Sequence, residues 1–352
     1  MKKIKILGAG LSGLTAAINL AKSGYTVEVY EKNEDVGMRF NGGIQGLENW
    51  SDKKDIIKEL REMNVDIDFD YTPFYNVLLT NGSKASEVRW KKPIFYLLRR
   101  GSFSGTIDHS LKAQALKSGV NIHFHETIDQ NEANIVATGP NVNEAVGIVK
   151  GIVFNTDIKD TVIIAFNDKM AFKGYSYLLV MHGYGCLCTV VRRDDAWRID
   201  RYFERTNEFF LKKIGFQTQH IKNVGGIGSF SLKKVKKGAT LYVGEAAGLQ
   251  DFLLGFGMRF AFASGYLAAQ SIIYKKDYEK IADNHFGKRL RVGIINRWLW
   301  ENILSKKDYS VLINFPQLIE NLYSTHNYNL LQQTMYPLTL FSLKKRYFKL
   351  KS

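Results

Sequence analysis

The first thirty residues alternate between short apolar runs and one amphipathic segment. Lys3–Leu7 reads as a strand, and apolar residues recur with helical spacing from Leu14 to Ala21. Gly24 ends the helical pattern, and Tyr25–Tyr30 alternates apolar and polar residues as a second strand does. The pattern predicts a strand–helix–strand unit at the start of the chain.

The middle of the chain has a different pattern. Aromatic and β-branched residues dominate from residue 145 to residue 231, so we expect this region to be built of strands. The predicted strands are Gly147–Asn155, Thr161–Asn167, Tyr175–Met181 and Cys186–Arg192, with a glycine-rich turn at Gly183–Gly185. From Lys275 onward the pattern becomes helical and rich in large apolar side chains.

A second strand-to-helix pattern lies far along the chain. Thr240–Val243 is apolar, and glycines separate it from a helical pattern that continues to Ala268. The stretch Leu253–Ile273 contains one charge, Arg259, but its glycines and polar residues are atypical of a membrane span. We expect it to form a buried loop and helix.

Composition excludes several classes of protein. The 352 residues can bury a large core, and two cysteines exclude a disulfide scaffold. Lys and Arg exceed Asp and Glu by 49 to 34, and nine basic against three acidic residues follow from Arg291 onward. This charge favours anionic partners such as phosphorylated cofactors or acidic lipids, or it simply solvates the surface. No nucleic-acid-binding motif accompanies it, so we expect no nucleic-acid partner.

The first motif that indicates a binding function is Gly8-Ala9-Gly10-Leu11-Ser12-Gly13. This GxGxxG run joins the first predicted strand to the first helix, and Glu31 ends the second strand 18 residues after Gly13. Gly8 allows the tight turn, Gly10 lets the backbone approach a pyrophosphate, and Gly13 lets helix and strand pack closely. Glu31 can accept hydrogen bonds from ribose hydroxyls. The unit predicts a site for a dinucleotide, either NAD or FAD, and its place so early in the chain favours FAD.

The distal pattern contains a second motif. Gly244-Glu245-Ala246-Ala247-Gly248 is followed by Gly255-Phe256-Gly257 and a helix that contains Ser264 and Gly265. This segment resembles the GDAAG…GxG motif of FAD enzymes in the superfamily of geranylgeranyl reductase and p-hydroxybenzoate hydroxylase. The resemblance implies that Glu245 binds a ribityl hydroxyl and that the second glycine pair approaches the flavin near a helix N-terminus.

The resemblance also implies roles for residues between the two motifs. Ala133–Thr138 with Gly139 corresponds to a strand that ends in a turn at the cofactor, and Asn121–Ile128 to a strand beside the adenine. Arg100 is expected to reach the cofactor phosphates or ribose, with Arg99 as its alternative. The predicted cofactor-binding residues are Gly8, Ala9, Gly10, Ser12, Gly13, Glu31, Lys32, Gly42, Gly43, Arg100, Ile128, Gly244, Glu245, Gly255, Gly257 and Met258.

The chain departs from the family pattern in three places. Glu245 replaces the usual aspartate, and Phe252 occupies a position where proline is common. Gly174–Val180 aligns with the YxWxFP segment, which lines the isoprenoid site of geranylgeranyl reductases. Of that segment, this chain keeps only a tyrosine, Tyr177. Because of these departures, the resemblance does not identify the substrate.

Together, pattern and resemblance predict an α/β fold. Residues 1–144 and 235–275 are expected to form a Rossmann-like FAD-binding domain. Residues 145–234 are expected to form an inserted antiparallel sheet for the substrate, and residues 276–352 a helical C-terminal region.

The predicted catalytic residues are less specific, because the flavin must carry the chemistry. His182, Tyr184 and Tyr177 are candidate proton donors. Cys186 and Cys188 alternate on one strand, as do His123 and His125, and both pairs are expected to be structural. We expect no metal site.

The resemblance implies an FAD-dependent oxidoreductase similar to geranylgeranyl reductases, which transfers hydride between the flavin and a hydrophobic, isoprenoid-like substrate. Electrons would come from NAD(P)H or another donor. The alternatives are a flavin monooxygenase and a non-catalytic lipid-binding protein of the same fold. We expect a cytoplasmic protein. The basic C-terminal region and the arginines around Trp298 and Trp300 have two interpretations: this region closes the substrate tunnel, or it associates with the anionic inner face of a membrane.

Overall fold

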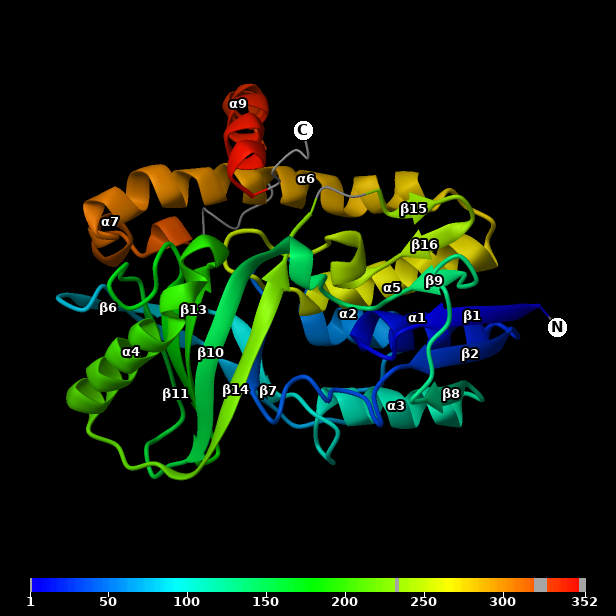
Figure 1. The fold of residues 1–352 in the computed structure, drawn as a ribbon, viewed down its shortest axis with the longest axis horizontal. Coiled ribbons are helices and arrows are strands. Elements are labelled where there is room, and N and C mark those ends of the chain that lie inside the picture. The colour runs from blue at the N-terminus through cyan, green and yellow to red at the C-terminus, as the bar shows by residue number, and fades with distance from the viewer. Residues whose placement is uncertain (1, 232–233, 320–327, 348–352) are drawn as a thin grey trace.

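The computed structural model describes residues 2–231, 234–319 and 328–347, and a mostly parallel sheet organises its N-terminal half (Figure 1). The strand order is β15 (Lys236–Lys237), β16 (Thr240–Tyr242), β9 (Ile135–Val136), β1 (Lys3–Leu7), β2 (Thr26–Glu31) and β8 (Asn121–Phe124). All neighbours in this sheet run parallel except β15 and β16, which form an antiparallel pair. This arrangement confirms the predicted Rossmann-like architecture.

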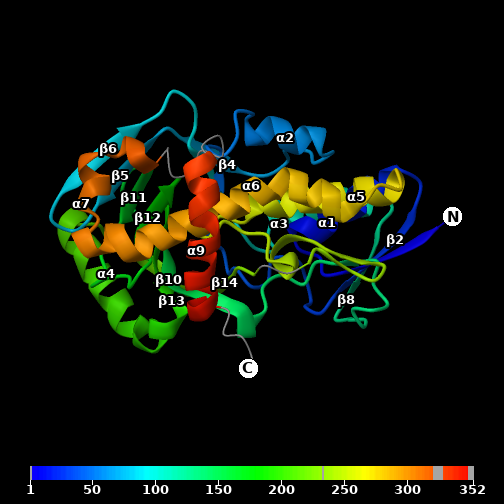
Figure 2. The ribbon, with the colours of Figure 1, turned by 90° about the horizontal axis from the view of Figure 1, so that it is seen from above.

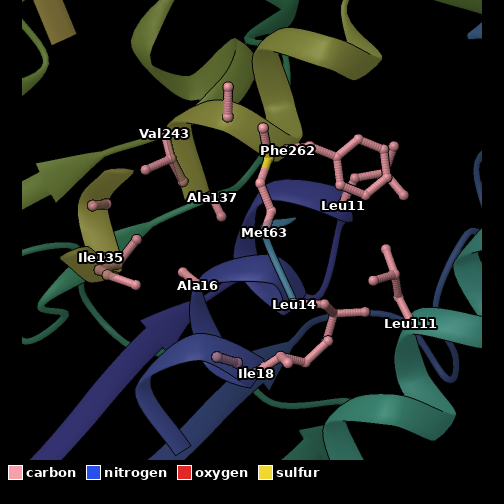
Figure 3. Packing of buried hydrophobic residues seen from close by; sticks show 14 of the residues in the cluster. Leu11, Leu14, Ala16, Ile18, Met63, Leu111, Ile135, Ala137, Val243 and Phe262 are labelled. Atoms are coloured by element: carbon pink, nitrogen blue, oxygen red, sulfur yellow. The ribbon is translucent and has the colours of Figure 1, made fainter. Parts of the chain in front are cut away.

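Three helices cover this sheet and form its hydrophobic core. They are α1 (Leu11–Lys22), α3 (Ile107–Lys117) and α5 (Met258–Ile273). Figure 3 shows Leu14 of α1 facing Leu111 of α3, with Ile18 one turn further along α1 and Phe262 of α5 and Ile135 of β9 on other sides. The predicted buried helix after Leu253 is therefore confirmed as α5, which packs directly on α1.

A second, larger sheet forms the other half. Its strand order is β14 (Gln219–Ser229), β10 (Ala145–Asn155), β13 (Tyr184–Arg192), β12 (Tyr175–Met181), β11 (Thr161–Ala165), β5 (Asn76–Thr80) and β6 (Ala85–Arg89). Strands β12 and β13 form a hairpin in which Met181 pairs with Tyr184. His182 and Gly183 between them both have positive φ, as a two-residue hairpin loop requires.

The two faces of this sheet bury different cores. Leu178, Leu187 and Phe154 face α4 (Ile199–Ile214), whereas Leu179 and Cys186 face the opposite way. A small third sheet, ordered β3 (Ile44–Glu48), β7 (Phe95–Arg99) and β4 (Tyr71–Phe74), lies with α2 (Ile56–Glu62) near the junction of the two halves (Figure 1).

C-terminal helices run across both halves. Helix α6 (Tyr278–Leu299) extends along the top of the molecule toward α7 (Ser310–Asn314), and α9 (Leu330–Tyr347) crosses it (Figures 1 and 2). A π-helical turn, Trp300–Leu304, continues α6, and short 3₁₀ turns occur at Val142–Glu144, Arg193–Arg198, Gly244–Ala247 and Ser305–Lys307. The expected helical C-terminal region is thus present in the described residues.

Three details differ from the sequence prediction. The region from 145 to 231 contains a helix, α4, as well as strands. Strands β5 and β6, which come from residues 1–144, belong to the second sheet because β5 pairs with β11. The strand predicted over Asn121–Ile128 ends at Phe124, because His125 takes a positive φ. His125 therefore does not alternate with His123 on one strand.

Candidate functional site

A cavity of about 930 Å³ lies between the parallel sheet and the inner face of the second sheet. Its polar end is lined by the Gly8–Ser12 loop, Glu31 and Glu245. Its apolar end is lined by side chains of the second sheet and of the loop before α5: Val149, Ile164, Tyr175, Tyr177, Leu179, Cys186, Cys188, Val190, Val224, Leu253, Leu254 and Phe256. One continuous space therefore joins the two predicted motifs to the predicted substrate sheet.

The polar end begins at the turn after β1. Gly8 has a φ of +106°, and a Cβ there would lie 2.5 Å from the carbonyl oxygen of Ala137, so only glycine fits. The carboxylate of Glu31 accepts a hydrogen bond from the backbone N–H of Ala9 at 2.9 Å, and its other oxygen accepts two from Asn33. Glu31 thus holds the glycine loop as well as facing the cavity.

Two helices direct their N-termini at this space. Gly10 caps α1 and Gly257 caps α5, and neither has a side chain that could bind the first-turn N–H groups. Both glycines line the cavity, as do Ser12, Gly255 and Met258. A Cβ added at Gly10 would meet no atom within 4 Å, so the loop is open on the side that a pyrophosphate would occupy.

Glu245 offers an oxygen that has no hydrogen-bond partner among the described residues. Its Oε2 forms an ion pair with Nη2 of Arg39 at 3.0 Å, and its Oε1 is buried without a hydrogen-bond donor. A buried carboxylate oxygen of this kind calls for a donor, and a sugar hydroxyl would supply one. With the open face of Gly10, this oxygen shows that the residues present fit an FAD molecule.

Arg100 lies in the cavity wall but is already engaged. Asp108 accepts two hydrogen bonds from its guanidinium group, both 2.8 Å long, and Gln45 accepts a third. The group also stacks on Phe40. Arg39, which lies beside it and is about half exposed, has more freedom to reach a phosphate.

The other predicted cofactor residues divide into two groups. Gly8, Ala9, Lys32, Gly43 and Glu245 line the cavity. Four others do not line it: Gly13, Gly42, Gly244 and Ile128. Gly13 packs against Gly8 and Ala137, and Gly42 packs against Tyr184. Gly244 packs against Ser12, and Ile128 packs against the hydrophobic core. Thr127 lines the cavity at the place predicted for Ile128.

Tyr177 is the predicted proton donor that the structure brings into the cavity. Its ring lies in the apolar wall, 5.9 Å from that of Tyr175. Burial and the neighbouring Cys188 raise the pKa of Tyr177 well above its ordinary value, so its hydroxyl stays protonated. The Tyr175 hydroxyl donates a 2.5 Å hydrogen bond to the carbonyl of Leu254 and so holds the loop before α5.

His182 and Tyr184 do not belong to the set of lining residues. His182 lies in the exposed hairpin loop, where its Nε2 is 2.8 Å from the Thr72 hydroxyl. The ring of Tyr184 stacks with Arg99, whose guanidinium group lies 4.1 Å from the ring centre. The hairpin turn that separates β12 from β13 carries both residues away from the cavity.

The two cysteines pack as expected, with one additional feature. Both are buried, and their sulfur atoms lie 3.6 Å apart in the wall of the cavity. The hydrogen bond with Cys186, together with burial, raises the pKa of the Cys188 thiol well above its ordinary value, so it remains a neutral thiol. The described residues contain no group of three metal-ligating side chains, and no described helix is long and apolar enough to cross a membrane.

Sequence reasoning missed two sets of polar residues at the site. Asp251 lines the cavity and accepts hydrogen bonds from the N–H groups of Leu253 and Leu254; burial raises its pKa to about 6. Lys173, Arg192 and Arg297 also line the wall near α6, where Asp168 pairs with Lys173 and Glu301 pairs with both arginines. No motif marks these residues, since four separate segments bring them together.

Comparisons with known proteins agree with this geometry. The family profile of the NAD(P)-binding Rossmann-like domain matches residues 6–44. The 1-hydroxycarotenoid 3,4-desaturase of a Flavobacterium species is 37% identical over 83 residues, which are 20% of this chain and 16% of the desaturase. The chain thus matches only a small part of this relative's length.

Solved structures extend the likeness to nearly the whole chain. A geranylgeranyl bacteriochlorophyll reductase-like protein from Thermoplasma acidophilum superposes with a TM-score of 0.72 at 19% identity, covering 98% of this chain and 99% of that protein. A flavin-dependent brominase variant superposes with a TM-score of 0.67 at 14% identity, covering 97% and 99%. The predicted resemblance is confirmed: the chain has the fold of the flavin-dependent oxidoreductases that includes the geranylgeranyl reductase-like proteins and flavin-dependent halogenases.

Proposed function

We propose that this chain is an FAD-dependent oxidoreductase that transfers hydride between the flavin and a carbon–carbon double bond of a hydrophobic, isoprenoid-like substrate. The observation that carries the proposal is the single cavity, polar at the Gly8–Ser12 loop and apolar along β12 and β13. A dinucleotide suits one end and a hydrocarbon chain the other. The similarity to a carotenoid desaturase, an enzyme named for double-bond chemistry, supports the same class of substrate.

Residues that line the polar end of the cavity would hold FAD. The N-terminus of α1 would face the pyrophosphate, Glu31 the ribose, and Glu245 the ribityl chain. Arg39, which is half exposed and paired with Glu245, would contact a phosphate. When bound, FAD supplies the redox step, with NAD(P)H or another donor as the source of electrons.

The apolar end of the cavity would bind the substrate and control which other molecules and groups reach its double bond. Leu179, Val190 and Phe256 exclude water and orient a hydrocarbon chain by packing. Tyr177, which carries its proton because its pKa is raised, is the candidate proton donor to a substrate carbon in this wall. Tyr175 positions the loop that lies between this wall and α5.

A flavin monooxygenase is the second candidate. The brominase likeness favours it. The ion pairs of Lys173, Arg192 and Arg297 make this part of the cavity wall polar, which suits a polar aromatic substrate better than a plain hydrocarbon. The two candidates differ in how the reduced protein reacts with oxygen.

One set of experiments distinguishes the candidates. The purified chain should have the visible spectrum of an oxidised flavin, and heating should release FAD. After anaerobic reduction, geranylgeraniol should reoxidise the protein faster than the solvent control does, and air should cause no substrate-coupled oxygen consumption. Hydroxylated or halogenated product with rapid oxygen uptake would favour the monooxygenase, and a colourless protein that FAD cannot reconstitute would refute both.

A further inference from the structure

Helix α9 has apolar side chains on two opposite faces. Its inner face packs on a cluster with Phe230, Phe252 and Ile294, and Leu343 at the centre of this face is fully buried. The residues of the inner face are Tyr336, Thr339, Leu340, Leu343 and Tyr347, spaced three or four apart. The inner face accounts for how α9 is attached to the protein.

The outer face is apolar but uncovered. Leu330, Leu331, Leu338 and Phe341 are 67–77% exposed, and none belongs to a buried cluster of the described residues. Leu331, Leu338 and Phe341 are seven and three residues apart, which places them on one side of the helix. Figure 1 shows α9 projecting from the top of the molecule, beyond the layer formed by α6. Four large apolar side chains on one projecting helix require a partner.

The charges beside this face identify the partner. Lys344 and Lys345 are exposed in the last turn of α9, whereas Arg346 forms an ion pair with the buried Glu301. The helix contains no acidic residue, and the sequence contains none after Glu320. The charges that α9 itself carries beside this face are positive, and they are complementary to an anionic lipid surface.

We propose that the outer face of α9 docks on an anionic lipid bilayer. Leu331, Leu338 and Phe341 would enter the boundary between headgroups and acyl chains, and Lys344 and Lys345 would lie at the level of the phosphates. A second copy of the chain is a weaker occupant, because α9 offers the two lysines no acidic partner. The proposal is independent of the redox function.

Docking in this way would bring the bilayer close to the cavity. Tyr347, at the end of the inner face, is one of the residues that line the cavity, and so are Phe252 and Arg297, which pack beneath it.

Vesicle flotation of the full-length protein tests the proposal. We expect flotation with vesicles of phosphatidylcholine mixed with phosphatidylglycerol, little with phosphatidylcholine alone, and loss in 1 M salt, where the screening length falls to roughly 3 Å. The double variant Leu338→Ser/Phe341→Ser should reduce partitioning about tenfold or more, because two large apolar groups no longer insert. Lys344→Glu/Lys345→Glu should reduce it by at least a similar factor.

The matched control is Lys212→Glu/Lys213→Glu on α4, which changes the net charge equally on another side of the molecule and should float like the wild type (Figure 1). Equal flotation of the α9 variants and the wild type would overturn the proposal, as would failure of the wild type to float at low salt. A dimer in sedimentation velocity that only Leu338→Ser/Phe341→Ser dissociates would assign the face to a second copy. Flavin content, measured in every sample, separates these outcomes from any failure of the proposed function.

Discussion

The carbonyl oxygen of Ser12 on α1 lies directly against Gly265 on α5, where an added Cβ atom would come within 2.1 Å of it. These two residues belong to the two glycine motifs, which are more than two hundred residues apart in the sequence. Their contact brings the N-termini of α1 and α5 to the same cavity. The close crossing of the two helices therefore assembles the candidate cofactor site.

Replacing Gly265 tests this crossing. Because the obstructing atom belongs to the backbone of α1, Gly265→Ala should lower the free energy of unfolding by about 1–3 kcal/mol. The matched control is Gly293→Ala on α6, where the nearest atom to an added Cβ is 3.7 Å away. That change should stabilise the helix by about 0.5–1 kcal/mol. Urea unfolding followed by circular dichroism measures both, and an equal effect of the two changes would contradict the close crossing.

The sequence predicted this half of the fold well because its signals are local. The turn at Gly8, the start of α1 and the acidic residue that ends β2 all lie within thirty residues and follow from hydrogen bonding and sterics alone. The distal motif was recognised because Gly244–Gly248 and Gly255–Gly257 resemble a known family segment.

Other features depend on contacts between distant segments and were predicted less well. No local pattern shows that β5 pairs with β11 rather than with the parallel sheet. Helix α4 does have a helical pattern in its sequence, because Tyr202, Thr206 and Phe210, spaced four residues apart, are all buried. The high aromatic content of the region favoured strands and hid this pattern. Arg100 lines the cavity, but no local pattern shows that Asp108 engages its guanidinium group.

The open space at Gly10 leads to a second prediction. Gly10→Val should leave the stability of the protein without FAD almost unchanged, because an added Cβ meets no atom within 4 Å and φ is −80°. The same change should abolish FAD binding, because the side chain would occupy the pyrophosphate position. Fluorescence titration with FAD and thermal unfolding measure the two effects. By contrast, Gly13→Ala should lower stability, since its Cβ would lie 2.1 Å from the carbonyl oxygen of Gly8. Normal flavin content in Gly10→Val would exclude this loop as the cofactor site.

The raised pKa of Asp251 leads to a pH-dependent prediction. Because burial raises this pKa to about 6 in the folded protein, from an ordinary value of 3.8, the folded state binds the proton more tightly than the unfolded chain. Stability should therefore fall as the pH rises from about 4 to about 6 and then level off. The contribution is about 1–3 kcal/mol.

The variant Asp251→Asn isolates this contribution. It keeps an oxygen that can accept the 2.7 Å hydrogen bond from Leu254 but does not titrate. His285, whose pKa burial lowers to about 4, makes stability rise with pH over much of the same range, but it does so equally in both proteins. We expect the variant to gain stability relative to the wild type between pH 4.5 and pH 7, measured by urea unfolding. A constant difference between the two proteins would mean that Asp251 is ionised throughout.

The last prediction concerns Glu301, a fully buried carboxylate that three arginines share. Nε of Arg297 donates to it at 2.7 Å and Nη1 of Arg192 at 3.1 Å, and Arg346 and Tyr347 of α9 also contact it. Burial alone would raise the pKa of Glu301, but Arg297, Tyr347 and Arg192 outweigh it and hold this pKa below its usual value. The carboxylate thus connects α6, β13 and α9 at the wall of the cavity.

Removing this carboxylate should be costly. Glu301→Ala leaves buried guanidinium groups without a counter-charge, so it should lower the free energy of unfolding by about 3–5 kcal/mol. Asp194→Ala removes a second carboxylate from Arg192, but an exposed one, and should cost less than about 1 kcal/mol. Because Arg346 and Tyr347 lose their partner, limited proteolysis should cut within α9 first in Glu301→Ala, at a rate that Asp194→Ala does not share. If α9 resists cleavage equally in both variants, its attachment depends on Leu343 and the inner face and not on this carboxylate.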